Sequence, residues 1–306
     1  MPPSASLSPP SATTSRTSVT VIKQRVTGAA ASAPEEDSLA IEDPIEIVLH
    51  YDDAQAGRTS KALALTMRTP GHDAEMITGF LFGEGIIQVA SDIDLIEFNA
   101  PLDCEPSTRA QVHLRTGLQL CADSFDRNFA IHSSCGICGK TSLDKLTLPA
   151  TLKIKDATTV DAAWIHQLPG LMHQDQEVFH KTGGLHAAAL FSSSDDSFTA
   201  REDIGRHNAL DKVIGAKLRK GKHAARGQVL CVSGRMSYEI LQKALVARIP
   251  IIAGVGAPSS LAVALANDFN LTLIGFVRNG SYNIYSCPER IGMTKSQRSC
   301  PQKKSR

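Results

Sequence analysis

The second half of the chain alternates short apolar runs with amphipathic segments of helical length, and this pattern limits the possible folds more than any other feature. The apolar runs lie at 229–232, 251–253 and 271–277, and helical patterns fill the intervals between them. Such alternation is typical of βαβ units, whose strands are covered by helices on both faces of the sheet. The sequence therefore predicts an α/β domain, which we place at 146–290.

Two further strand signals flank these units. Segments 187–191 and 198–201 are separated by a polar turn and predict a hairpin at the start of the domain. Ile284 and Tyr285 predict a final strand. We expect helices over 210–218, from Ser237 to Ala247, and after Pro258.

The region from 44 to 123 has a different pattern. Ile45, Ile47 and Leu49 alternate with polar residues, as in a half-buried strand. Further strands are predicted at 63–67, 95–98 and 110–114, and a helix that Asp73 would cap. We expect a small α+β domain with order beginning near residue 44.

Both ends of the chain lack such patterns. Residues 1–43 begin with a stretch rich in Ser, Thr, Pro and Ala that contains no apolar block, and we predict a disordered extension. An organelle transit peptide is the alternative for this basic, acid-poor start. Residues 291–306 are predicted to form a basic, disordered tail.

Composition narrows the class of protein. In 306 residues, 42% are hydrophobic and 21% charged, which is a globular balance, and the formal charge of +1 excludes a broadly basic nucleic-acid binder. No apolar run approaches the roughly 20 residues of a membrane-spanning helix. Seven scattered cysteines and the absence of a secretory signal favour a reducing, cytoplasmic location. We expect neither nucleic acid nor membrane among the partners.

A loop at 124–145 separates the two predicted domains and carries Cys135 and Cys138. Three chemistries use thiols at this spacing: zinc ligation, dithiol redox cycling and persulfide relay. Zinc needs four ligands, and only His132 lies near the pair. Thioredoxin-like redox chemistry needs a strand-to-helix junction inside a βαβ pattern, which this loop precedes. A relay needs only one exposed, activated thiolate.

The reactivity of such a thiol depends on the fraction of it that is ionised. At neutral pH a thiol of pKa about 8.5 is only about 3% ionised, whereas one lowered to about 7 is half ionised. Lys140 and a protonated His132 flank the pair and could lower the pKa. A moderate shift favours transfer, because nucleophilicity falls with pKa.

Arginine–glycine junctions follow several apolar strands. Two of them are Ser233-Gly234-Arg235 and the segment 276–281, and charged or histidine-bearing blocks occur at 182–190 and 201–212. Arginine matches phosphate geometry, and ligands of α/β sheets bind at the carboxyl ends of the strands. Together the junctions predict an anionic, nucleotide-like ligand. Taken singly, each of these segments is equally consistent with a turn, a structural histidine or a solvated helix start.

Several of these blocks occur together in one order along the chain. They are Pro70-Gly71-His72, Gly79-Phe80-Leu81-Phe82-Gly83-Glu84-Gly85-Ile86-Ile87, Cys135-Gly136-Ile137-Cys138-Gly139, the blocks 182–190 and 201–212, Ser233-Gly234-Arg235 with Glu239, Pro258-Ser259-Ser260-Leu261-Ala262, and Gly275-Phe276-Val277-Arg278. This ordered set, from about 44 to 288, resembles the formate dehydrogenase accessory sulfurtransferases of the FdhD family.

The resemblance implies a cytidine-deaminase-like α/β domain preceded by the smaller domain, with a mobile Cys-x-x-Cys loop between them. It also implies that a cysteine desulfurase passes sulfur, as a persulfide, to Cys135, with Cys138 as its partner. That sulfur would go on to the molybdenum (or tungsten) bis(molybdopterin guanine dinucleotide) cofactor of formate dehydrogenase, the client enzyme. The cofactor-binding residues implied by the resemblance are Phe276, Val277, Arg278, Asn279, Gly280 and Ser281.

The two guanine dinucleotide arms of that cofactor suggest a homodimer with two matching pockets. The alternative function is a non-catalytic chaperone that holds the molybdenum cofactor and delivers it. A zinc-dependent nucleotide hydrolase is a third possibility, but deaminases of that kind need His-x-Glu. Here Ala188 stands where the glutamate would be, two residues after His186, and we expect no metal site.

Overall fold

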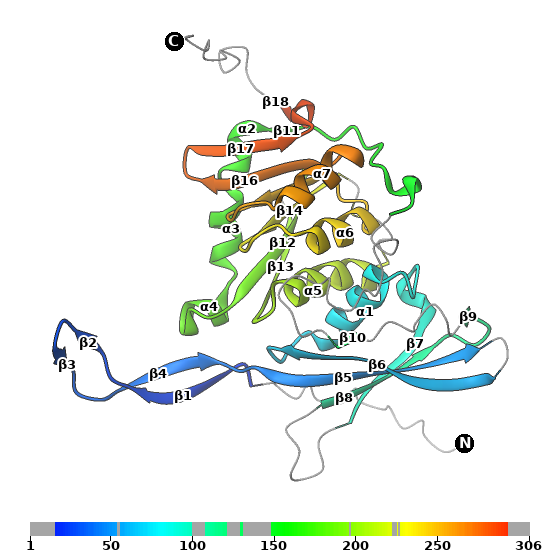
Figure 1. The fold of residues 1–306 in the computed structure, drawn as a ribbon, viewed down its shortest axis with the longest axis horizontal. Coiled ribbons are helices and arrows are strands. Elements are labelled where there is room, and N and C mark those ends of the chain that lie inside the picture. Colours follow the sequence, from blue (N-terminus) through cyan, green and yellow to red (C-terminus); the bar gives the residue numbers. More distant parts are fainter. Residues whose placement is uncertain are drawn as a thin grey trace, which may run out of the picture.

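The computed structural model describes residues 16–53, 56–99, 108–120, 129–130, 148–195, 197–221, 225 and 227–292. Cys135 and Cys138 lie outside these residues. The described chain forms two sheets of six strands, stacked one above the other in Figure 1 with helices between them. None of the helices in these ranges is both long enough and apolar enough to cross a membrane.

The larger domain is built on a mixed sheet in the order β13-β12-β14-β15-β16-β17. Its strands are β12 (His186–Ser192), β13 (Phe198–Asp203), β14 (Gln228–Val232), β15 (Ile251–Gly254), β16 (Thr272–Arg278) and β17 (Ser281–Ser286). The predicted hairpin, apolar runs and final strand are confirmed. Strands β12 and β17 run antiparallel to their neighbours, so the other four point the same way.

Helices cover both faces of this sheet. Ala188 and Leu190 pack with α5 (Arg206–Arg219), α6 (Tyr238–Val246) and α7 (Ser260–Asp268) in one apolar core. Ala187 and Phe191 face the other way, against α2 (Ala162–Ile165) and α3 (Leu168–Gln174). The alternation follows from the two-residue period of a strand. The short α4 (Glu177–Thr182) precedes β12.

The smaller domain has α1 (Asp73–Gly83) on one face of its sheet. Its strands are β5 (Asp43–Asp53), β6 (Gly57–Arg68), β7 (Ile93–Asn99), β8 (Thr108–Leu114), β9 (Gln119–Leu120) and β10 (Phe129–Ala130). Ile45, Ile47 and Leu49 point into the core as their alternation predicts. The expected cap by Asp73 is wrong: His72, in the left-handed region at φ 58, precedes the helix, and Asp73 opens it and pairs with Arg68 at 3.1 Å.

Five short strands lie where disorder or a loop was expected from the sequence. Residues 129–130, inside the loop predicted at 124–145, form β10, which pairs in parallel with Ala64 and Leu65 of β6. Near the amino end, β1 (Ser18–Lys23) pairs with β4 (Glu35–Ala40), and β2 (Val26–Thr27) pairs with β3 (Ala30–Ala31). The disorder predicted for 1–43 is therefore wrong for these strands, because β-branched residues alternate there within a composition that otherwise indicates disorder.

The remaining elements are short. Strand β18 (Ile291–Gly292) pairs with β11 (Val160–Asp161) and extends the ordered chain two residues past the predicted end of the domain. Single turns of 3₁₀ helix are found at Ala90–Asp92, Ala150–Leu152 and Pro288–Arg290.

The two domains meet where α1 crosses α5. A methyl group on Gly79 would lie 1.9 Å from the backbone oxygen of Asp211, and one on Gly215 would lie 1.8 Å from that of Glu75. The two backbones are therefore in direct contact, which only glycine permits at these positions.

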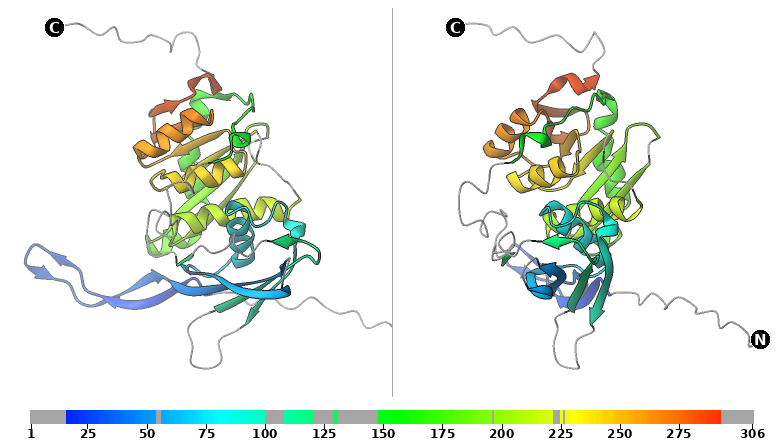
Figure 2. Two further views of the ribbon diagram at one scale, coloured as in Figure 1. Left: turned by 45° about the vertical axis from the view of Figure 1, so that its right-hand side comes forward. Right: turned by 90° about the vertical axis from the view of Figure 1, so that its right-hand side faces the viewer.

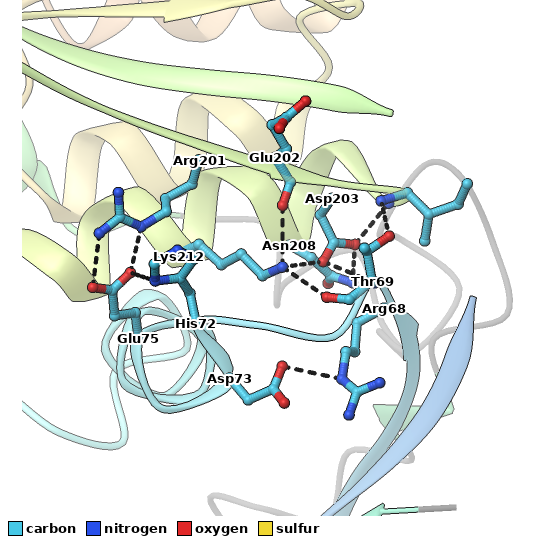
Figure 3. Close-up of polar contacts among 12 residues, drawn as sticks. Arg68, Thr69, His72, Asp73, Glu75, Arg201, Glu202, Asp203, Asn208 and Lys212 are labelled. Atoms are coloured by element: carbon cyan, nitrogen blue, oxygen red, sulfur yellow. Dashed lines mark hydrogen bonds and ion pairs between the residues drawn. The ribbon is translucent and has the colours of Figure 1, made fainter. Parts of the chain in front are cut away.

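A buried lysine joins the domains beside this crossing (Figure 3). The Nζ of Lys212 lies 2.7 Å from the Asp203 carboxylate and donates to the backbone oxygens of Thr69 at 2.9 Å and Glu202 at 3.1 Å. The side chains of Lys212 and Asp203 are fully enclosed. A buried ammonium group is tolerated only when it is paired and hydrogen-bonded, so these contacts fix the position of the loop after β6.

Asn208 ties the end of β6 to the first turn of α5. Its Nδ2 donates to the backbone oxygen of Met67 at 2.8 Å and to Asp203 at 3.1 Å. The same Asp203 carboxylate accepts from the amides of Thr69 and Gly205. The end of a strand in the small domain is thereby held against the start of a helix in the large one.

A second ion pair bridges the domains at Glu75. Arg201 holds this carboxylate through two hydrogen bonds of 2.6 and 2.9 Å, and His72 lies 3.3 Å from it. Burial raises the pKa of Glu75, but hydrogen bonds and charge from His72 and Arg201 outweigh burial and lower the pKa from 4.5 to about 2. The folded state therefore favours the ionised carboxylate.

This pKa predicts a pH-dependent contribution to stability. A carboxylate whose pKa falls on folding stabilises the protein above its unfolded pKa, and this stabilisation is lost as the pH falls from about 4.5 towards 2. We expect Glu75→Gln to cost roughly 1–2 kcal/mol at neutral pH, since the carboxylate is only partly buried and solvent screens its charge. In urea titrations, the difference in free energy of unfolding between the variant and wild type should be smaller near pH 3 than at neutral pH. An equal difference at the two pH values would contradict this assignment.

Candidate functional site

The carboxyl ends of four strands and the starts of three helices share one edge of the larger sheet. Strands β13, β14, β15 and β16 all point to this edge, and α5, α6 and α7 begin just beyond β13, β14 and β15. Helix amino ends carry partial positive charge and unpaired backbone N–H groups. The edge is therefore built to attract an anion.

Three glycines allow the loops at this edge to pack closely. A methyl group on Gly256 would lie 2.7 Å from the backbone oxygen of Gly234, and one on Gly275 would lie 3.0 Å from Pro258. The loop after β14 also exchanges hydrogen bonds with the loop after β15, through Met236. The backbone of this edge is consequently fixed in place and bare of side chains at its closest contacts.

Two arginines and a histidine surround Gly234. A methyl group on Gly234 would lie 3.4 Å from both the Arg206 Cδ and the His186 Nδ1, so these side chains flank the glycine. Burial, and then the charges of Arg206 and Arg235, lower the pKa of His186 below 6.5. At neutral pH the imidazole is uncharged beside two permanent cations, an arrangement that suits a phosphate group.

His207 lies deeper in the same edge and resembles a catalytic histidine only superficially. Its Nε2 is 3.3 Å from a Glu239 carboxylate oxygen and 3.5 Å from the Ser237 Oγ. A serine–histidine–acid relay places the acid on Nδ1 and the serine on Nε2, whereas here both contact one nitrogen. Burial, aided by the charges of Arg206 and Lys243, lowers the pKa of His207 to about 3. The geometry is that of a positioning hydrogen bond.

The segment 276–281 covers the end of β16, the two-residue turn after it and the first residue of β17. Phe276 has a φ of 56°, in the left-handed region. It is 42% exposed, and its amide donates a hydrogen bond to the Gly256 oxygen. An aromatic residue held there costs of order 1–3 kcal/mol, and such strain clusters at functional sites. The Arg278 guanidinium donates to the backbone oxygen of Val255 at 2.7 Å, which fixes it at the same edge.

The other members of the predicted segment differ in what they can offer a ligand. Asn279, Gly280 and Ser281 are exposed at the turn, and Gly280 has a φ of 85°. Val277 is buried in the apolar core, so only its backbone could reach a ligand. The assignment of all six residues to cofactor binding stays a prediction.

The structure divides the charged block 201–212 between two roles. Arg206 and His207 lie at the sheet edge, but Arg201, Asp203 and Lys212 join the two domains. The sequence analysis offered ligand binding or a solvated helix start for the block, and neither describes these three residues. Their partners lie at 69–75, and no local sequence pattern indicates that these two distant segments come together.

The predicted sulfur carriers, Cys135 and Cys138, lie outside the described residues, but the preceding chain is placed. Ala130 pairs with Leu65, and β10 runs parallel to β6. The end of β6 lies against the larger domain, because the Met67 oxygen accepts a hydrogen bond from Asn208 in the first turn of α5.

Gly256 and Gly275 were not singled out by the sequence analysis as site residues. The available signal was a glycine directly after an apolar strand, as at Gly234. In the parts of the chain that the structure describes, no three His, Cys, Asp or Glu side chains are grouped as metal ligands. Ala188, at the place of a deaminase glutamate, is fully buried.

The comparisons with known sequences agree on one family. The profile of the FdhD/NarQ family matches residues 40–292. Proteins named "Sulfur carrier protein FdhD" from Streptomyces avermitilis and Mycolicibacterium paratuberculosis are each 42% identical to the chain; the alignments cover 87% and 88% of this chain and 92% and 98% of theirs.

A solved structure has the same fold. It is that of a proposed formate dehydrogenase accessory protein from Desulfotalea psychrophila, with a TM-score of 0.66 at 24% identity, covering 90% of this chain and all of that one. The family profile spans both sheets, the joint between them and the glycine-lined edge. On this match, and on relatives that align along nearly their whole length, the chain belongs to the FdhD/NarQ family.

Proposed function

We propose that this protein is a sulfur carrier that takes persulfide sulfur from a cysteine desulfurase and passes it to the molybdenum bis(molybdopterin guanine dinucleotide) cofactor of formate dehydrogenase. The names of its relatives and of the solved neighbour support this role. The observation that carries the proposal is the cationic, glycine-lined edge, which includes the start of α5; that start contacts the end of β6, the strand with which β10 pairs.

The chain between β10 and the carrier cysteine is long enough to reach past the end of β6. Extended chain from Ala130 to Cys135 spans at most about 18 Å. The strand from Leu65, which pairs with Ala130, to Met67 covers about 7 Å, and Met67 touches the first turn of α5. The extended length of the chain from Ala130 to Cys135 therefore exceeds the distance along β6 from the pairing point to the end that contacts α5.

The two thiols of the segment are sufficient for a sulfur transfer in which atoms and electrons balance. The Cys135 thiolate attacks the terminal sulfur of the desulfurase persulfide, the S–S bond breaks, and the desulfurase thiolate leaves; this exchange is redox-neutral. Attack by the Cys138 thiolate on the Cys135 sulfur then forms a Cys135–Cys138 disulfide and releases HS⁻ to the metal centre. The thiol pair supplies the two electrons, and a cellular dithiol must reduce the disulfide afterwards.

The edge supplies recognition for a guanine dinucleotide arm. The exposed ring of Phe276 offers a stacking surface for a base, and base–aromatic stacking contributes about 1–3 kcal/mol. Arg206, Arg235 and the helix amino ends suit the diphosphate. Gly234 and Gly256 let the ligand approach the backbone.

Phe276→Gly separates ligand binding from stability. Glycine adopts a φ of 56° without strain, so the melting temperature should stay the same or rise. Loss of the ring should weaken the affinity for GDP, used as a probe of the guanine arm, by roughly 5- to 100-fold in a calorimetric titration. Unchanged affinity would remove Phe276 from the site.

Arg278→Ala tests the charged part of the edge. We expect weaker GDP binding by about tenfold or more, because a charge-assisted contact and the anchor on Val255 are both lost. Arg219→Ala, at the far end of α5, is the matched control and should bind GDP as wild type does. Equal losses in the two variants would indicate a general charge effect.

A cofactor-holding chaperone is the alternative function, favoured by the same edge. It shares every expectation about GDP and differs only in the cysteines, which would then be dispensable for delivery. Detection of a persulfide on Cys135 by mass spectrometry separates the two functions.

A further inference from the structure

A β-bulge interrupts β16 within the segment proposed to bind the ligand. The pairing of β16 with β17 places two residues, Phe276 and Val277, opposite the single residue Tyr282. Bulges of this kind change the direction of a side chain and are common beside active sites. Phe276 adopts its left-handed conformation here, at a φ of 56°. Because that conformation is strained, contacts with the rest of the fold must hold it.

The loop after β15 holds one side of the bulge. The Phe276 amide donates to the Gly256 oxygen at 3.2 Å, and the Arg278 guanidinium donates to the Val255 oxygen at 2.7 Å. Neither contact involves the backbone oxygen of Arg278.

A second support comes from α2, which lies beside the hairpin of β16 and β17 in Figures 1 and 2. The Nδ1 of His166, at the carboxyl end of α2, lies 3.1 Å from the backbone oxygen of Arg278. The His166 ring also packs against the ring of Tyr282, with 4.8 Å between the two centroids. His166 therefore contacts both strands of the hairpin, at the residue after the bulge and at the residue opposite it.

His166 is itself held firmly in the larger domain. The preceding residue, Ile165, is fully buried in the apolar core on this face of the sheet. The side chain of Asp161 caps the amino end of α2. The Tyr282 hydroxyl donates to the Ala162 oxygen at 3.3 Å, which ties β17 to the same short helix. The position of His166 relative to the hairpin is therefore fixed by both ends of α2.

The hydrogen-bonding roles in the contact with Arg278 are defined by its chemistry. A carbonyl oxygen only accepts, so the hydrogen lies on the Nδ1 of His166. An asparagine side chain places an N–H donor at about the position of Nδ1, whereas alanine has no donor. Substitution by these two residues therefore distinguishes the hydrogen bond from the ring.

We propose that His166 is a positioning residue for the glycine-lined edge: its hydrogen bond to the Arg278 backbone and its contact with Tyr282 hold the β16 bulge in the conformation that presents Phe276 to the ligand. His166 acts through the backbone of Arg278 and not by touching the ligand. The inference rests on the proposed function, since it takes the segment 276–281 to be part of the ligand site.

Calorimetric titration of the full chain with GDP tests this role. His166→Ala should weaken GDP binding about fivefold or more, because other conformations of the hairpin then compete with the one that binds. His166→Asn should bind GDP within about threefold of wild type, since its amide can donate to the same oxygen. A His166→Ala protein that binds GDP as tightly as wild type would overturn the proposal.

His180→Ala is the matched control. The Nε2 of His180 also donates to a backbone oxygen, that of His173 at 2.9 Å, but in α4, which lies apart from the β16–β17 hairpin in Figure 1. The two alanine variants lose the same kind of bond, so their melting temperatures should fall by similar amounts. Only His166→Ala should lose affinity for GDP, and an equal loss in His180→Ala would contradict a positioning role.

Amide hydrogen exchange without ligand separates this inference from the proposed function. Exchange in a peptide covering 276–284 should be faster in His166→Ala than in wild type, and close to wild type in His166→Asn. Unchanged exchange in His166→Ala would overturn the positioning role even where wild type binds GDP. A wild type that does not bind GDP would instead refute the ligand site itself, and the role of His166 with it.

Discussion

Gly79→Ala should leave little or no folded protein. The added methyl group would lie 1.9 Å from the backbone oxygen of Asp211, and the neighbouring atoms are backbone, which cannot rotate aside. The two helices would have to separate where the domains join, so we expect a loss of at least about 3 kcal/mol, at the upper end of overpacking effects. Gly215→Ala should behave in the same way, because it meets the Glu75 oxygen at 1.8 Å.

Gly170→Ala is the matched control for both substitutions. Gly170 also lies within a helix, α3, but a methyl group there meets nothing within 4 Å. Alanine is the better helix former, so this variant should be as stable as wild type or up to about 1 kcal/mol more stable. Urea unfolding followed by circular dichroism measures all three. A Gly79→Ala protein as stable as Gly170→Ala would show that the α1–α5 contact is looser than described.

Cys135→Ser should abolish activation of formate dehydrogenase without changing the melting temperature. A hydroxyl group cannot form a persulfide, so no sulfur would be carried, and activity of the client should fall to the level seen without the protein. The measurement is formate oxidation by a client enzyme produced with each variant. Full activation by Cys135→Ser would remove the carrier role.

Two other cysteines provide controls. Cys287→Ser should activate normally, since Cys287 donates to Asn270 and serine can donate as well. Cys231 is no alternative carrier, because burial raises the pKa of its thiol to about 12.

Cys138→Ser should accept sulfur from the desulfurase but release it slowly, as the second thiol supplies the electrons for release.

The sheet of the larger domain was predictable from local patterns. Apolar runs at 229–232 and 251–253 become buried parallel strands because such runs need cover on both faces, which βαβ units provide. The amino-terminal ribbon of β1 and β4 was not predicted. Val19 and Val21 alternate with polar residues over only a few positions, within a segment whose overall composition indicates disorder.

The candidate site was predictable in part. Arginine beside glycine after a strand indicated the edge at Gly234, and the structure places that junction at the carboxyl ends of the strands; binding of a ligand there stays a prediction. The role of Asp203 and Lys212 was not accessible, because their partner Thr69 is more than a hundred residues away and only the folded chain brings them together. The left-handed Phe276 likewise follows from the close approach of Gly256, a tertiary contact that no local pattern encodes.

The central claim is that Cys135 carries sulfur, and mass spectrometry tests it most directly. The protein is incubated with a cysteine desulfurase and cysteine, then digested without reductant. We expect an adduct of about 32 Da on the Cys135 peptide, the mass of one sulfur atom. The adduct should persist in Cys138→Ser and be absent from Cys135→Ser. No adduct on Cys135, in a protein that still binds GDP, would contradict sulfur transfer and leave the chaperone.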